Sequence, residues 1–338
     1  MFVSRRLNPR SFLGAVFVMT AAVIVGVCLL PHSRYVRFSD LHESAVAKAV
    51  WIYERTHFDP APLDVVFVGS SHTVFGIDSA AIEQSIRATN GREVHVANFA
   101  MQHLGRDLQY ALAKAAIAAR PVKLLVIEVQ EAESRAQHPA FASLADAPDI
   151  VTAPMLINTN YLDNLVHLPP RQIRLFLHGL TPGAFGDRDA FDPSRYAGTH
   201  WNDTIKEQAL TAAPPRTGAP SAVELDVERQ HLDRMEAGKM SLPGPLKPLE
   251  TRTSLIYLRE MVDIARHAGT TVRFLYLPTF AAPPTPPAAD FYRTLAPIWC
   301  PSDIYAHQGW WYDVAHLNTQ GAAALSAWIG RAIAKEGL

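Results

Sequence analysis

The stretch that decides the fold lies between positions 65 and 73 and reads Val65-Val66-Phe67-Val68-Gly69-Ser70-Ser71-His72-Thr73. Its first half is a short apolar run rich in β-branched residues, which is typical of a strand buried on both faces of a parallel sheet. A glycine and two serines then interrupt the run, as they do at a tight turn. We therefore expect a central strand over Asp64–Val68 and, within one turn, a helix that begins at Ser71.

Strand and helix patterns alternate on both sides of a long gap that follows this stretch. They predict a helix over Ser79–Ala88, a strand over Val94–Phe99, a helix over Asp107–Arg120 and a strand over Val122–Val129, then a helix over Ser254–His267, a strand over Thr271–Leu277 and a helix over Thr319–Ala334. This alternation indicates an α/β fold, a three-layer sandwich in which helices cover both faces of a parallel sheet. Ligands of such folds bind beyond the carboxyl ends of the strands, where Ser70 and Ser71 would lie.

The alternation stops between residues 134 and 250, a region with many prolines and polar turns. Helical patterns occur there only over Asn160–Val166 and Gln172–His178. We interpret the region as an insertion rather than a separate domain, because the sheet pattern resumes after it. Since it leaves the sheet directly after the third strand, we expect it to pack as a cap over the carboxyl edge, near Ser71.

The N-terminal part contains an apolar segment. Residues 12–30 carry no charge, and as a helix they would span about 28 Å, close to the hydrocarbon thickness of a bilayer. The flanking basic residues are Arg5, Arg6 and Arg10 before the segment, and Arg34 and Arg37 after it. This slight bias places the N-terminus in the cytoplasm. A cleaved signal peptide is the alternative, but the segment is longer than a typical signal core and no small-x-small cleavage site ends it.

The chain therefore divides into three parts. Residues 1–33 form a cytoplasmic N-terminus and a transmembrane anchor, expected to be a single helix that is retained and separated from the body. Residues 34–61 form a juxtamembrane segment with a helix over Ser44–Glu54, and residues 62–338 form the α/β domain with its insertion. The predicted location is the cytoplasmic (inner) membrane, crossed once, with the body in the periplasm.

Composition narrows the class of protein. With a net charge of -1, the chain lacks the excess of basic residues that is typical of nucleic-acid-binding proteins. With 49% hydrophobic and 19% charged residues, the chain is typical of a globular enzyme with a membrane segment. Its two cysteines, Cys28 in the apolar segment and Cys300 in the body, cannot plausibly pair. The absence of CxxC, HExxH or a close His/Cys cluster argues against a structural metal or haem, and we expect no cofactor.

A second motif lies near the C-terminus, in the run Trp310-Trp311-Tyr312-Asp313-Val314-Ala315-His316-Leu317-Asn318. Asp313 and His316 are three residues apart, so they can be aimed at one point. A serine hydroxyl is a poor nucleophile until a base takes its proton, and a carboxylate holds that base in the right tautomer. Together with a serine at a strand tip, the pair indicates nucleophilic acyl chemistry. Each motif alone is also compatible with a Ser or Asp that caps a helix.

The two motifs together resemble the SGNH (GDSL-like) hydrolase superfamily, whose signature is Gly-x-Ser after the first strand and Asp-x-x-His near the C-terminus. Gly69-Ser70-Ser71 and Asp313-Val314-Ala315-His316-Leu317 match that signature, and the resemblance covers roughly residues 62–133 and 254–334. It implies an SGNH-like, flavodoxin-like catalytic domain over residues 62–338. Ser71 would be the nucleophile, His316 the general base and later the acid, and Asp313 the carboxylate that orients His316. Ser70 is the alternative nucleophile one position away.

The oxyanion-binding residues of that family are not matched. The family uses a glycine after the second strand and an Asn after the third. Here the loop after the second strand has only the later Gly105, and Gln130 is the amide nearest the end of the third strand. These two are the candidates for oxyanion binding. A lost oxyanion donor costs about 2.7–4 kcal/mol of transition-state stabilisation, so the mismatch bears on the rate of hydrolysis more than on the fold.

With its N-terminal anchor, the chain resembles the membrane-tethered SGNH proteins of cell-envelope and exopolysaccharide acylation. This implies serine-dependent acyl or acetyl transfer to an extracytoplasmic polysaccharide or envelope glycan, or removal from it, through an acyl-serine intermediate. A membrane partner would supply the acyl donor. Transferase and esterase stay open, because a sugar hydroxyl or water can attack the same intermediate. The alternative is a non-catalytic SGNH-like module that binds glycan or scaffolds a polysaccharide secretion assembly.

Overall fold

The centre of the molecule is a five-stranded sheet in which every paired strand is parallel. The structure, a computed structural model, describes residues 8–41, 46–184, 187–196, 218–239 and 241–337. The strands are β1 (Val65–Val68), β2 (Val96–Asn98), β3 (Leu124–Val129), β4 (Thr271–Tyr276) and β5 (Ile298–Trp299), in the spatial order β2-β1-β3-β4-β5. This is the order of flavodoxin-like doubly wound sheets, whose ligands bind where the winding reverses, between β1 and β3.

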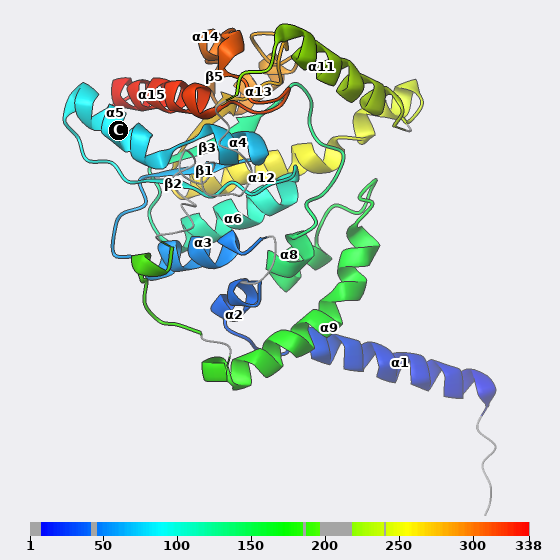
Figure 1. Cartoon of the computed structure of the whole chain (residues 1–338). Coiled ribbons are helices and arrows are strands. Elements are labelled where there is room, and N and C mark those ends of the chain that lie inside the picture. Colours follow the sequence, from blue (N-terminus) through cyan, green and yellow to red (C-terminus); the bar gives the residue numbers. More distant parts are fainter. Residues whose placement is uncertain (1–7, 42–45, 185–186, 197–217, 240, 338) are drawn as a thin grey trace, which may run out of the picture.

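Alternate residues of β1 point into two separate cores, so the sheet is buried on both faces. Val66 and Val68 pack against α6 (Arg106–Ala119), α12 (Arg252–His267) and α3 (Lys48–His57). Val65 and Phe67 pack against α5 (Ser79–Asn90) and α15 (Thr319–Lys335). Figure 1 shows these two helical layers on opposite sides of the sheet. The predicted α/β architecture with a parallel sheet is therefore confirmed.

The ends of the strands and helices predicted outside the insertion agree with the structure to within a few residues, except at two places. The helix expected over Ser44–Glu54 is α3, which ends at His57; residues 42–45 lie outside the described part of the chain. The strand β5 was not predicted. It has two residues and lies between Pro297 and Pro301, so it is too short to leave an alternating or apolar pattern.

The apolar N-terminal segment is one helix, α1 (Pro9–Cys28), as predicted. It is long and apolar enough to cross a membrane. Its expected separation from the body is wrong at one end. The Gln172 side-chain amide donates a 3.1 Å hydrogen bond to the Cys28 carbonyl, and Cys28 packs against a small apolar cluster of the body. The short helix α2 (Arg34–Ser39) then leads the chain back to α3.

The first part of the insertion does not lie where it was predicted. It contains α7 (Phe141–Leu144), α8 (Ala147–Val151) and α9 (Tyr161–Leu180). Phe141, Ile150 and Leu168 pack against Tyr257 of α12, so this part covers the outside of the α6–α12 layer instead of the carboxyl edge of the sheet. In Figure 1, α8 and α9 lie beyond that layer, where α9 meets the end of α1.

The helix α9 also corrects the expected pair of short helices, because it continues through Pro169 and Pro170. Proline normally interrupts a helix. Here the side chains that follow the prolines anchor the second half to the body. Arg171 donates hydrogen bonds to the carbonyls of Ala142 and Ala145, and Leu175 is buried. Tertiary packing thus outweighs the local cost of the prolines.

The second part of the insertion reaches the opposite end of the molecule. The turns η1 (Pro182–Ala184) and η2 (Pro193–Tyr196) come first, residues 197–217 lie outside the described part, and α11 (Ala222–Ala237) and η3 (Gly244–Leu249) follow. In Figure 1, α11 lies near α13 (Ala289–Leu295) and α14 (Ser302–Tyr305). Its Glu228 and Arg229 bond to loops at the carboxyl ends of the strands. Of the described insertion, α11 is the part that meets this edge.

Candidate active site

The turn after β1 presents two serines in different environments. Ser71 is the first residue of the short helix α4 (Ser71–Gly76), as predicted, and it is partly exposed. Ser70 is buried and caps that helix, accepting from the His72 N–H at 3.3 Å. A Cβ atom on Gly69 would collide with the side chains of Thr73 and Glu128, so only glycine permits this close approach.

Ser71, His316 and Asp313 lie in hydrogen-bonded sequence. The His316 Nε2 atom is 2.9 Å from the Ser71 Oγ atom, and Nδ1 is 2.9 Å from each carboxylate oxygen of Asp313. The predicted contacts are therefore present, although Ser71 and His316 are far apart in the chain. Ser70 makes other contacts, so the geometry selects Ser71 as the serine that faces the imidazole.

The backbone around Asp313 keeps its carboxylate charged. Its Oδ1 atom accepts from the N–H groups of Ala315 and His316, each at 2.8 Å. Burial acts to raise the pKa of Asp313, but the hydrogen bond and charge of His316 and these two N–H groups lower it on balance. An ionised Asp313 holds a proton on Nδ1 of His316, which leaves Nε2 free to accept one from Ser71.

A buried carboxylate that the sequence analysis did not single out holds the serine turn in place. Glu128 lies in β3, beside β1, and accepts hydrogen bonds from both the N–H and the hydroxyl of Ser70 and of Thr73. Burial acts to raise its pKa, but the hydrogen bonds from Ser70 and Thr73 lower it on balance. The available signal was one charged residue inside the otherwise apolar strand Leu-Leu-Val-Ile-Glu-Val.

Gln130 and Gly105, the two residues predicted to bind the oxyanion, lie in different surroundings. The Gln130 amide donates to Glu128 at 2.7 Å and to the Ser70 hydroxyl at 3.2 Å, so it is beside the serine turn but directed inward. Gly105 precedes α6, and a Cβ atom there would collide with His138 and Asp107. The close approach of the chain at His138 explains this glycine without an oxyanion.

The loop that carries Asp313 and His316 is fixed from two sides. The Val314 N–H donates to Glu228 of α11 at 3.0 Å, and the Val314 carbonyl accepts from the Phe280 N–H at 2.7 Å. The fully buried Trp311 donates from its indole to the Tyr305 carbonyl at 3.2 Å. Of the aromatic run before Asp313, Trp311 therefore belongs to the core, whereas Trp310 and Tyr312 are half-buried. Glu228 was not predicted, because nothing in the sequence pairs the insertion with this loop.

Two rings border His316 on the side of α4. The ring of Phe75 meets it edge-on, with ring centroids 5.3 Å apart, and the ring of His72 lies at 5.4 Å. Burial lowers the pKa of His72, which favours its neutral form beside the imidazole that must carry the proton.

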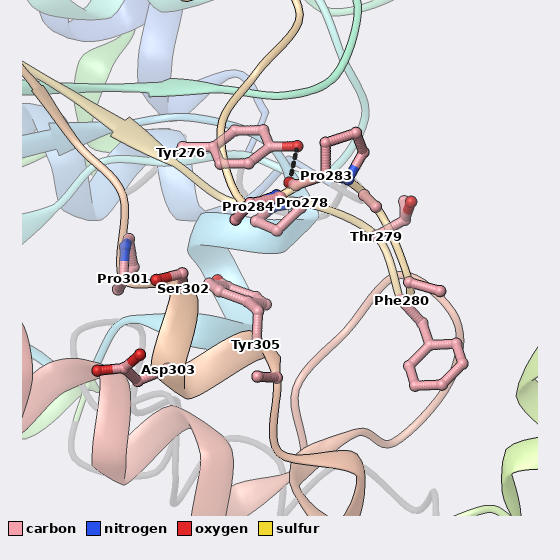
Figure 2. A pocket seen from close by; sticks show the side chains of 13 residues that line it. Tyr276, Pro278, Thr279, Phe280, Pro283, Pro284, Pro301, Ser302, Asp303 and Tyr305 are labelled. Carbon is pink, nitrogen blue, oxygen red and sulfur yellow. Dashed lines mark hydrogen bonds between the residues drawn. The ribbon is translucent and has the colours of Figure 1, made fainter.

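A pocket of about 430 Å³ lies at the carboxyl ends of β4 and β5. Figure 2 shows Tyr276, Tyr305 and several prolines around it. Its wall includes Thr279, which donates to Glu131 after β3, and Phe280, which is bonded to Val314. Ser71, Asp313 and His316 do not line the pocket, which is linked to their loop through Phe280.

Among the residues that the structure describes, no group of three or more His, Cys, Asp or Glu side chains could hold a metal ion. In comparisons with known proteins, no family model matches the chain, and no curated protein matches it either. The chemistry of the site must therefore be argued from its geometry.

Proposed function

We propose that this protein transfers an acyl group, such as acetyl, to or from an extracytoplasmic glycan through an acyl-serine intermediate on Ser71. One observation carries the proposal: Ser71, His316 and Asp313 are aligned by hydrogen bonds at the carboxyl edge of a parallel sheet. An unaided serine hydroxyl stays protonated at neutral pH, and an oriented imidazole can both take and return its proton.

The reaction has two halves. In the first, His316 Nε2 takes the Ser71 proton while Oγ attacks the ester carbonyl of the donor. The tetrahedral intermediate then collapses, the bond to the leaving alkoxide breaks, and His316 returns the proton to that oxygen. In the second half, His316 takes a proton from a sugar hydroxyl or from water, whose oxygen attacks the carbonyl carbon of the acyl-serine. The second tetrahedral intermediate then collapses, the bond from that carbon to Ser71 Oγ breaks, and His316 returns the proton to Oγ. The acceptor alone separates transfer from hydrolysis.

The oxyanion of both intermediates needs a donor, and the turn offers one in its backbone. The N–H groups of Ser70, His72 and Thr73 all donate within the site. Among the residues that the structure describes, none accepts the N–H of Ser71. We assign this N–H to the oxyanion, because it belongs to the residue whose Oγ atom forms the new bond.

The shape of the chain supports a polymer acceptor and a membrane donor. The pocket at the carboxyl ends of β4 and β5 is lined by aromatic rings and prolines, against which the apolar faces of a sugar can pack. The α1 helix would tether the protein to the inner membrane, with the body in the periplasm and close to a membrane protein that supplies the acyl donor. These features and the Gly-x-Ser and Asp-x-x-His motifs fit an SGNH-type enzyme of envelope or exopolysaccharide acylation.

The experiment is an assay of the purified full-length protein with p-nitrophenyl acetate, with and without an oligosaccharide acceptor. We expect release of p-nitrophenol, and acetylated oligosaccharide wherever transfer is favoured. Ser71→Ala should abolish both products. Full activity of this variant would refute the acyl-serine intermediate.

The inward-facing Gln130 favours a second candidate, a glycan-binding or scaffold module without catalysis, because the expected side-chain oxyanion donor is engaged elsewhere. Glycan binding by the wild-type protein, without p-nitrophenol release, would support this module instead.

A further inference from the structure

The helix α9 has two faces of opposite character. Its buried side chains, which include Leu168 and Leu175, hold it against the body. Five large apolar side chains on α9 are exposed instead: Leu162, Val166, Ile173, Leu177 and Leu180. At 3.6 residues per turn these five fall within an arc of about 60°, on the side opposite the buried residues. We call these five residues the α9 apolar face.

This face lies beside the end of α1. The Cys28 carbonyl, in the last turn of α1, accepts from Gln172 of α9. Gln172 is itself buried, and on the helix surface it lies at the edge of the buried side that is nearer to Leu162 and Leu180. In Figure 1 the middle of α9 meets the C-terminal end of α1, and the rest of α1 extends away from the body. If α1 spans a bilayer, its last turn marks the boundary of the hydrocarbon layer, so this boundary passes next to α9.

The chain just before α9 also carries exposed apolar side chains. Val151 at the end of α8, and Met155 and Leu156 in the connection, are all exposed. Polar side chains border the α9 apolar face along one edge, where Asp163, His167 and Arg174 are exposed. A continuous apolar stripe with a polar edge is the pattern of a helix that lies in the plane of a membrane interface, with its apolar side buried by roughly 5–10 Å.

We propose that the α9 apolar face, with Met155 and Leu156, lies in the outer interface of the bilayer that α1 crosses. The occupant of this face is therefore lipid. The body is then held by a spanning helix and by a surface helix, which limits its rotation about α1. The inference rests on the membrane anchoring part of the proposed function and is independent of acyl transfer.

The test places a photoreactive side chain, p-benzoylphenylalanine, at one position of the full-length protein in vesicles of phosphatidylethanolamine and phosphatidylglycerol with radiolabelled acyl chains. The probe replaces Leu162 or Val166, which are 72% and 71% exposed, so it displaces no core residue. The matched control is Val223, which is 72% exposed and belongs to α11, a helix that lies far from α1 in Figure 1. A probe at Phe17 of α1 reports the anchor itself.

After irradiation, we expect lipid label on the proteins with probes at positions 17, 162 and 166. The protein with the probe at position 223 should carry only background label. Label at 17 but none above the control at 162 and 166 would overturn the proposal while leaving the anchor in place. Crosslinks from 162 and 166 to a second copy of the protein, in place of lipid, would also overturn it. Absence of label at 17 would refute the anchor and this proposal together. Ester hydrolysis by the same samples is a separate readout of the proposed function.

Discussion

The carboxyl edge of the sheet and the outer side of α9 are built in opposite ways. At the edge, polar groups are held by hydrogen bonds to buried or half-buried partners, as in the contacts of Glu128 with Ser70 and Thr73 and of Asp313 with His316. Along α9, large apolar side chains such as Leu162 and Val166 face outward. Hydrogen bonds fix the positions of the side chains at the edge, whereas α9 presents apolar surface area to a nonpolar medium. Substitutions at the edge should therefore change the rate of the reaction. Substitutions on α9 should change how the body is positioned at the membrane.

The largest effect is expected at the edge, from removal of the base. His316→Ala should lower kcat for p-nitrophenyl acetate by about 10³-fold or more, because Ser71 then loses its proton acceptor. Leu162→Asn on α9 should leave kcat in detergent unchanged. Equal losses in the two variants would break the contrast between the regions.

A second prediction concerns the stability of the serine turn. Glu128→Ala should lower the free energy of unfolding by roughly 3–5 kcal/mol, because it leaves the buried donors of Ser70 and Thr73 without an acceptor. Urea denaturation of the full-length protein measures the loss. Because the pKa of Glu128 is lowered from its ordinary 4.5, its stabilising effect is present above pH 4.5 and is lost as the pH falls through the folded-state pKa. A loss of stability that is the same at pH 7 and at strongly acidic pH would contradict this account.

Asp107 gives the opposite case of a buried carboxylate. Its Oδ1 atom accepts from Leu108 and His138, but among the described residues its Oδ2 atom has no partner, and burial raises its pKa to about 7. The folded state therefore favours the protonated form, so stability should fall as the pH rises from about 4 to about 7. Asp107→Asn should remove this dependence and raise stability at pH 8 by roughly 2–4 kcal/mol. Thermal or urea unfolding from pH 5 to 8 tests the prediction, and an unchanged pH profile in the variant would refute it.

The smallest effect is expected in the pocket. Tyr305→Ala should raise KM for an oligosaccharide acceptor by about fivefold while kcat changes little, since one aromatic contact contributes roughly 1 kcal/mol. The Tyr305 carbonyl that holds Trp311 belongs to the backbone and is retained. A fall in kcat without a change in KM would place Tyr305 in support of the Asp313 loop instead of in acceptor binding.

The sequence allowed the local parts of this arrangement to be predicted. The β1 run, the turn at Gly69, and the spacing of Asp313 and His316 are patterns within a few residues, and the order of strands and helices identifies the parallel sheet. The contact of Glu128 with the serine turn depends on β1 and β3 being neighbours, which no local pattern reveals. Likewise, α9 continues through two prolines only because its far half is anchored by Arg171. The position of the insertion could not be predicted, because its apolar residues pack on both sides of the sheet. Phe141, Ile150 and Leu168 contact the α12 side, whereas Leu225 of α11 belongs to the core on the α15 side.

The central claim is that Ser71 is an activated nucleophile, and labelling with a fluorophosphonate probe tests it most directly. The full-length protein in detergent should form one covalent adduct, which peptide mass spectrometry places on Ser71 and not on the neighbouring Ser70. The adduct should be absent in Ser71→Ala, strongly slowed in His316→Ala and unchanged in Leu162→Asn. A wild-type protein that forms no adduct, or forms it equally well without His316, would contradict the account.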